Sequence, residues 1–147
     1  MRENRSLKIL LVEDNDDHAH LIMGIIEATA ADHTIFRVSN GEEALTYLDS
    51  ATDSETQWPD VVMLDMKMPF LNGIETLAEI RGRKQQSDVP VVIVSTSDSA
   101  NEIQSAFQCG ANGYVVKPLQ YDDLKIKIRD FIHYWSEVSE TPGFRVQ

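Results

Sequence analysis

The segment VVMLDMKMPF at residues 61–70 decides the fold, because an unbroken apolar run ends there in a carboxylate. Residues 61–64 include no polar side chain, which is typical of a strand buried on both faces of a parallel sheet. Asp65 follows this run and precedes Met68-Pro69. A charge at the end of a buried strand is costly unless something compensates it, so Asp65 is the first candidate for a functional residue.

Four other short runs rich in Val and Ile share this pattern and predict further buried strands. They lie at residues 9–12, 35–38, 91–94 and 114–116. Amphipathic stretches separate the runs, and the last stretch carries apolar residues at helical spacing, Leu124, Ile128, Phe131, Ile132 and Trp135. This alternation predicts an α/β fold, a right-handed, doubly wound, five-stranded parallel sheet with helices on both faces.

The composition fits one folded domain and excludes several classes of function. The chain has 147 residues, 42% of them hydrophobic, and a formal net charge of −11. Such an acidic chain lacks the Lys and Arg clusters that bind nucleic acid, so no nucleic-acid partner is expected. No apolar stretch approaches the roughly 18 residues of a membrane span, and no signal peptide is recognisable, so a cytoplasmic protein without membrane contact is predicted. Cys109 is the single cysteine, which excludes an internal disulfide.

Polar side chains gather at the predicted carboxyl ends of the strands. In a doubly wound sheet, ligands bind outside these ends, so the residues found there are the candidates for chemistry. Three carboxylates, adjacent hydroxyls and a lysine occupy these positions: Glu13-Asp14, Asp65, Ser95-Thr96 and Lys117-Pro118. Strand alternation favours Ser95 over Thr96 as the inward hydroxyl, because Ser95 shares a face with Val91 and Ile93.

This combination of side chains suits phosphoryl transfer with a divalent cation. Clustered carboxylates repel and raise one another's pKa values, and Mg²⁺ resolves that conflict because it prefers oxygen ligands. One carboxylate that stays ionised can then attack phosphorus and form an acyl phosphate. Such a transfer needs in-line positioning and neutralisation of the phosphoryl oxygens, which the cation, Lys117 and Ser95 would supply.

Four segments resemble the signature segments of response-regulator receiver domains in two-component signalling, in the family's order and spacing. The match covers roughly residues 7–135, and the segments are KILLVEDN (8–15), VVMLDMKMPFLNG (61–73), PVVIVSTSD (90–98) and GANGYVVKP (110–118). The resemblance implies a flavodoxin-like (βα)5 receiver. We therefore expect a single receiver domain over residues 1–147, with its core at about 7–136 and a tail at 137–147 that is too short for an output domain.

The resemblance also implies a role for each residue that matches the family's motifs. Asp65 matches the phosphoacceptor, Asp14 the direct Mg²⁺ ligand and Glu13 the acid that holds the metal through water. The backbone carbonyl of Lys67 matches the position that completes the metal site. The catalytic lysine and the switch residues of the family correspond to Lys117, and to Ser95 and Tyr114. The bond between Lys117 and Pro118 corresponds to one that is cis in the family.

As a receiver, the chain is expected to take its phosphoryl group from a sensor histidine kinase in a phosphorelay. It would catalyse its own phosphorylation and dephosphorylation rather than act as an enzyme on other substrates. The polar segment DSATDSETQ (49–57), read as an extended loop, and the ending FIHYWSEVSETP (131–142) are similar to stand-alone receivers paired with phytochromes. That narrower resemblance implies a phytochrome-type kinase and a homodimer formed through the fourth helix, fifth strand and fifth helix.

Two other classes of function fit parts of the pattern. A degenerate receiver that acts only as an interaction module would keep the fold without the chemistry, and the intact acids and lysine argue against it. A phosphatase with an aspartate nucleophile, similar to haloacid dehalogenases, would need a second acid two residues after Asp65, where Lys67 stands. The role of Trp58, before the third strand, is left open by the sequence.

Overall fold

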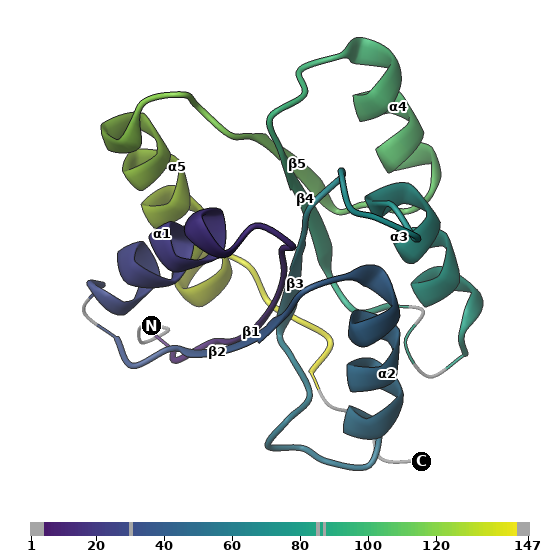
Figure 1. The fold of residues 1–147 in the computed structure, drawn as a ribbon. Helices are drawn as coiled ribbons and strands as arrows, with labels where there is room; N and C mark the ends of the chain where they lie inside the picture. The colour runs from purple at the N-terminus through teal and green to yellow at the C-terminus, as the bar shows by residue number, and fades with distance from the viewer. Residues whose placement is uncertain (1–4, 30, 85, 87, 144–147) are drawn as a thin grey trace.

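The computed structural model describes residues 5–29, 31–84, 86 and 88–143, and these residues form one parallel sheet with helices on both faces (Figure 1). The five strands lie in the order β2-β1-β3-β4-β5. Their bounds are Lys8–Val12 (β1), Thr34–Val38 (β2), Val61–Leu64 (β3), Val91–Ser95 (β4) and Gly113–Val116 (β5). The doubly wound, five-stranded fold predicted from the sequence is confirmed.

The helices form two layers, with α1 and α5 on one face of the sheet and α2, α3 and α4 on the other (Figure 1). Their bounds are Asp16–Glu27 (α1), Gly41–Ala51 (α2), Gly73–Gly82 (α3), Ala100–Gln108 (α4) and Tyr121–His133 (α5), and a π-helical turn, η1, continues α5 over Tyr134–Val138. Within the described part of the chain, no helix has both the length and the apolar character needed to cross a membrane.

Alternate residues of each central strand enter different cores. In β3, Val62 and Leu64 pack with α2 and α3, whereas Val61 and Met63 pack with α1 and α5. Because both faces are covered, a strand in this position has no polar alternation, which explains the unbroken apolar runs. The same alternation in β4 turns Ser95 into the protein, where it is fully buried, and leaves Thr96 exposed.

Side-chain caps start four of the helices at the carboxyl edge of the sheet. Each cap side chain accepts a hydrogen bond from a backbone N–H three residues later, and the caps are Asn15 (α1), Asn40 (α2), Asn72 (α3) and Ser99 (α4). Helix α3 has a complete capping box, because the Glu75 side chain also accepts from the Asn72 backbone. These caps fix the residue at which each helix begins. The residues that follow the strands therefore lie in defined connections between strand and helix.

Two segments differ from the sequence-based expectation. The expected loop at 49–57 is shorter, because helix α2 extends to Ala51, which is fully buried against the core that α2 and α3 cover. Trp58, whose role was left open, is a buried member of that same core. At the other end of the chain, Trp135 is buried in the opposite core with α1 and α5, and Arg5 donates a hydrogen bond to its carbonyl oxygen at 2.8 Å.

The loop between β3 and α3 contains a strained residue. Phe70 has a φ of 69°, and among the described residues it is the non-glycine residue found in the left-handed region. Its ring is 84% exposed, so no packing within the chain offsets the strain. A left-handed conformation costs an L-residue roughly 1–2 kcal/mol, which glycine does not lose.

Phe70→Gly should therefore raise the free energy of unfolding by about 1 kcal/mol, since glycine adopts this conformation without a Cβ clash. Urea denaturation of both proteins measures the difference. Phe70→Ala is the matched control, because it removes the exposed ring and keeps the strained Cβ. Equal stabilisation by both variants would contradict the assignment of the effect to the backbone.

Candidate metal centre

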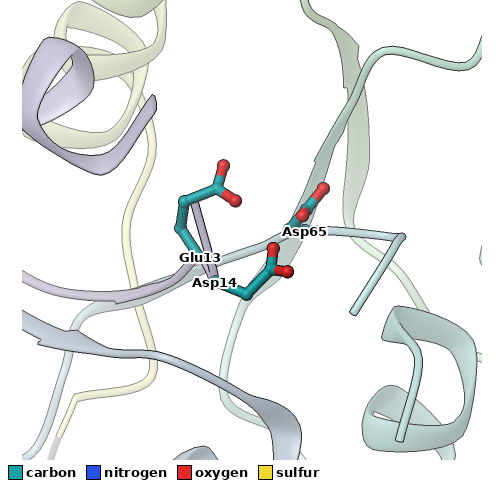
Figure 2. A group of neighbouring side chains, drawn as sticks. All are labelled: Glu13, Asp14 and Asp65. Atoms are coloured by element: carbon teal, nitrogen blue, oxygen red, sulfur yellow. The ribbon is translucent and has the colours of Figure 1, made fainter. Parts of the chain in front are cut away.

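Three carboxylates from two neighbouring strands meet at the carboxyl edge of the sheet. Glu13 and Asp14 follow β1, and Asp65 follows β3, which is paired with β1 so that Val12 lies opposite Leu64. One oxygen atom from each of the three side chains lies within 4.8 Å of the others. Figure 2 shows the three carboxylates gathered around one space.

The sheet itself positions this cluster, since its hydrogen-bond ladders continue past the strand ends. The backbone N–H of Asp65 donates to the carbonyl oxygen of Val12 at 3.0 Å, and the N–H of Glu13 donates to that of Val38 at 3.1 Å. The backbone of Glu13 and Asp65 is therefore held by the sheet. Sites built on such rigid elements hold their side chains in more precise positions than sites built on loops.

A buried lysine neutralises one of the three acids. Lys117, which follows β5, is 8% exposed, and Glu13 is 1% exposed. The Lys117 ammonium lies 2.5 Å from Glu13 Oε1 and 3.8 Å from Asp65 Oδ1. Removing one partner of such a buried pair would leave an uncompensated charge, so Lys117 and Glu13 depend on each other.

The pKa values of Glu13 and Asp65 move in opposite directions. Burial raises the pKa of Asp65 to about 7, and the Glu13 carboxylate adds to the rise, whereas Lys117 and the backbone N–H of Lys67 lower it. Burial would also raise the pKa of Glu13, but the hydrogen bond and charge of Lys117 bring the pKa below its usual value. Glu13 is therefore the more acidic member of the pair, and Asp65 keeps its proton up to a higher pH.

This donor set fits a hard divalent cation. It consists of carboxylate oxygens only, and burial makes an ionised Asp65 costly until another positive charge compensates it. Asp14 is exposed and lines an open cavity of about 730 Å³ together with Lys67 and the start of α4, so this acid of the cluster is open to solvent. Glu13, Asp14 and Asp65 are the residues that would hold the ion.

Ser95 and Tyr114, predicted from the resemblance as a switch pair, are linked through a residue that the sequence did not reveal. Ser95 Oγ accepts a hydrogen bond from the backbone N–H of Ser97 at 3.1 Å. The hydroxyl of Tyr114, on β5, donates to the backbone carbonyl oxygen of Ser97 at 2.9 Å. Ser97 thus connects the buried hydroxyl to the aromatic ring through both of its backbone polar groups.

Two further neighbours of the acids were missed from the sequence. His18, on α1, has its Nδ1 3.4 Å from the Lys117 ammonium and 3.9 Å from Glu13 Oε1. Arg37, on β2, donates to the backbone carbonyl oxygen of Glu13. A lone charge in the apolar strand TIFRV was the available signal for Arg37, but its partner lies on another strand.

The expectation of a cis bond between Lys117 and Pro118 is wrong for this structure. No peptide bond among the described residues is cis. The trans form is the intrinsically favoured one for a bond before proline, by about 0.5–1 kcal/mol.

Comparisons of the sequence with known proteins identify response regulators as its relatives. The family model of the response regulator receiver domain matches residues 9–129. The probable methanogenesis regulatory protein FilR2 of Methanothrix harundinacea is 35% identical over 135 residues, which are 92% of this chain and 87% of that protein. The response regulator Rcp1 of Synechocystis is 27% identical over 136 residues, which are 92% of each chain.

Solved structures of response regulators have the same fold as this chain. The Mn²⁺-bound form of Rcp1 superposes with a TM-score of 0.83 at 26% identity and covers 93% of this chain and 99% of that one. The phosphorylated cyanobacterial phytochrome response regulator RcpA has a TM-score of 0.86 at 29% identity, with 95% and 100% covered.

The raised pKa of Asp65 makes stability depend on pH in metal-free protein. The pKa is about 7 in the folded state against an ordinary 3.8, so the folded chain holds the proton more tightly, and stability falls as pH rises between these values. Asp65→Asn removes the cost of burying this charge. Its free energy of unfolding should exceed that of the wild type by about 2 to 4 kcal/mol at pH 8, with little difference near pH 4.

Denaturant unfolding in the presence of a chelator measures this difference. Asp53→Asn, which changes an exposed aspartate in the connection before β3, is the matched control, and its difference in stability from the wild type should not change between pH 4 and pH 8. A stability difference for Asp65→Asn that stays constant from pH 4 to pH 8 would contradict the assigned proton.

Proposed function

This chain belongs to the response-regulator receiver family, and we propose that it accepts a phosphoryl group from a sensor histidine kinase onto Asp65, with Mg²⁺ held by Glu13, Asp14 and Asp65. One observation carries the proposal, namely that oxygens of all three acids lie within 4.8 Å of one another beside the Lys117 ammonium. The similar protein Rcp1 has been solved in an Mn²⁺-bound form, which supports the proposal of a divalent cation here. Mg²⁺ is the hard cation that suits one or two carboxylates together with phosphate oxygens.

The transfer is a displacement at phosphorus. A carboxylate oxygen of Asp65 attacks the phosphorus of the kinase's phosphohistidine, the new oxygen–phosphorus bond forms, and the phosphorus–nitrogen bond breaks with its electron pair going to the imidazole nitrogen. When bound, the cation neutralises charge on the acids and on the equatorial phosphoryl oxygens. The product is an aspartyl phosphate, and later attack by water would restore the Asp65 carboxylate and release phosphate.

Each remaining residue of the site has a defined task in this scheme. Asp14 would be a ligand of the ion, and Glu13 and the backbone carbonyl of Lys67 would help to hold it. Lys117, now 3.8 Å from Asp65, pairs with a phosphoryl oxygen once the phosphoryl group is in place. The three carboxylates and the Lys117 ammonium already lie close together.

The signal leaves the site through Ser97. When the Ser95 hydroxyl turns toward the phosphoryl group, it gives up the hydrogen bond from the Ser97 N–H. The Ser97 backbone then shifts, and the hydrogen bond from Tyr114 to its carbonyl oxygen shifts with it. A local charge change is converted in this way into a rearrangement of β5 and the start of α4, which a partner protein reads.

The kinase that we propose is of the phytochrome type, and the chain works as a stand-alone receiver that signals through protein contacts. Rcp1 and the cyanobacterial phytochrome response regulator RcpA match nearly the whole of this chain and are themselves matched over nearly their whole length. A receiver signals through a surface that partner proteins bind, and we place that surface on the face of α4, β5 and α5.

We assign a homodimer contact to that face. Phe107 on α4 and Tyr134 and Val138 in η1 are each about half exposed. A cavity of about 480 Å³ lies against β5 and α5 and is lined by Tyr134, Trp135 and neighbouring residues. Exposed apolar side chains of this kind are suited to burial against a second copy.

Acetyl phosphate with Mg²⁺ should label the wild type, because a small acyl phosphate can replace the kinase as donor, and Asp65→Asn should remain unlabelled. Phosphate-affinity electrophoresis or intact-mass measurement detects the modification. Asp53→Asn should be labelled like the wild type, since it retains every group of the site. Labelling that persists in Asp65→Asn would show that another residue accepts the phosphoryl group.

Phe107→Glu should weaken self-association at least tenfold, because it places a charge in the proposed apolar contact. Analytical ultracentrifugation of phosphorylated and unphosphorylated protein measures the dissociation constant. Leu21→Glu changes a similarly exposed leucine on α1, outside this face, and serves as the matched control. An equal effect of both variants, or a monomeric wild type under both conditions, would overturn the assigned interface.

A further inference from the structure

Arg37 lies beside the metal centre on a strand that contributes no acid to it. Strand β2 is the neighbour of β1 at one edge of the sheet (Figure 1). Arg37 lies opposite Leu11. The Arg37 side chain is 20% exposed, so most of it is covered by the protein. A partly buried guanidinium must find acceptors, and its acceptors identify what it holds.

The guanidinium clamps the turn between β1 and α1. Its Nε and Nη2 both donate to the backbone carbonyl oxygen of Glu13, at 3.1 and 2.6 Å. Its Nη1 lies 2.8 Å from Asp16 Oδ1, at the first residue of α1. One rigid planar group thus joins the end of the strand to the start of the helix.

Both backbone polar groups of Glu13 are therefore held from β2. Its N–H donates to the carbonyl oxygen of Val38, and its carbonyl oxygen accepts from Arg37. The peptide plane that contains this carbonyl also contains the N–H of Asp14, because the peptide unit is planar. Fixing the carbonyl therefore fixes the direction in which the chain enters Asp14.

We propose that Arg37 is a positioning residue for the divalent cation, acting through the Glu13–Asp14 peptide rather than by contact with the ion. The inference rests on the proposed function, because it assumes that Asp14 and its neighbours bind a metal. Groups that orient metal ligands commonly change metal affinity 10- to 100-fold when they are removed.

The positive charge of Arg37 and its contact with the Glu13 carbonyl have opposite predicted effects on the affinity for a divalent cation, so mutation can separate them. Arg37 is a cation near a cation site, so Coulomb repulsion alone predicts that Arg37→Met binds a divalent ion more tightly. The positioning role predicts weaker binding, because the freed Glu13 carbonyl lets the peptide and Asp14 rotate. A loss of affinity can then be attributed only to lost geometry.

Mn²⁺ binding to the full chain, followed by the loss of the free-ion electron paramagnetic resonance signal, gives the dissociation constant directly. We expect it to rise about tenfold in Arg37→Met. Arg37→Lys keeps the charge but loses the planar guanidinium. Its dissociation constant should lie between those of the wild type and Arg37→Met. Arg83→Met, which removes an arginine paired with Asp49 on helix α2, is the matched control and should bind like the wild type.

A second measurement separates positioning from a general loss of structure. In Mg²⁺ titrations of acetyl phosphate labelling, Arg37→Met should need about tenfold more Mg²⁺ for half-maximal rate and should recover a near wild-type rate at saturation. Far-ultraviolet circular dichroism and a thermal melt establish that each variant is folded, and Arg37→Lys carries the test should Arg37→Met not fold.

The outcomes separate this inference from the function on which it rests. Unchanged or tighter Mn²⁺ binding by folded Arg37→Met, beside a wild type that binds, overturns the role of Arg37 and leaves the proposed function intact. A wild type that binds no Mn²⁺ overturns the proposed metal site, and the inference with it. A loss of affinity equal in Arg83→Met would also overturn the inference, since the loss would then not depend on the contact between Arg37 and the Glu13 carbonyl.

Discussion

The site depends on two neighbouring acids competing for one ammonium group. Lys117 contacts Glu13 at 2.5 Å and stays 3.8 Å from Asp65, so one buried charge is matched and the other is left to hold a proton. An added positive charge would lower the pKa of Asp65 and favour its ionised form, because burial disfavours a lone carboxylate. In the proposed function, binding of the cation and ionisation of the Asp65 nucleophile are therefore coupled.

The sheet supplies the register that this competition requires. Asp65 and Glu13 each extend a hydrogen-bond ladder by one residue, and the ladder from β2 also carries Arg37 to the Glu13 carbonyl. A shift of one residue in either strand would send an acid to the opposite face, because side chains alternate along a strand. The strands that carry the acids pack against a core on each face, so such a shift would disrupt the packing of both cores.

Much of this could be predicted from the sequence, because the signals are local. Apolar runs mark buried strands, and a parallel sheet places their carboxyl ends together, which brings Glu13, Asp14, Asp65 and Lys117 to one edge. The links made by Arg37 and Ser97 could not be predicted, since each joins segments whose distance depends on the folded register. The left-handed Phe70 also escaped, because phenylalanine gives no local signal for that conformation.

The two tryptophans lie in different cores, Trp58 with α2 and α3 and Trp135 with α1 and α5. The chain therefore carries one intrinsic fluorophore for each helical layer. A variant that keeps only one indole would report the exposure of its own layer during unfolding, whereas far-ultraviolet circular dichroism averages over both. Whether the layers separate from the sheet together or in sequence thus becomes an optical observable that needs no attached label.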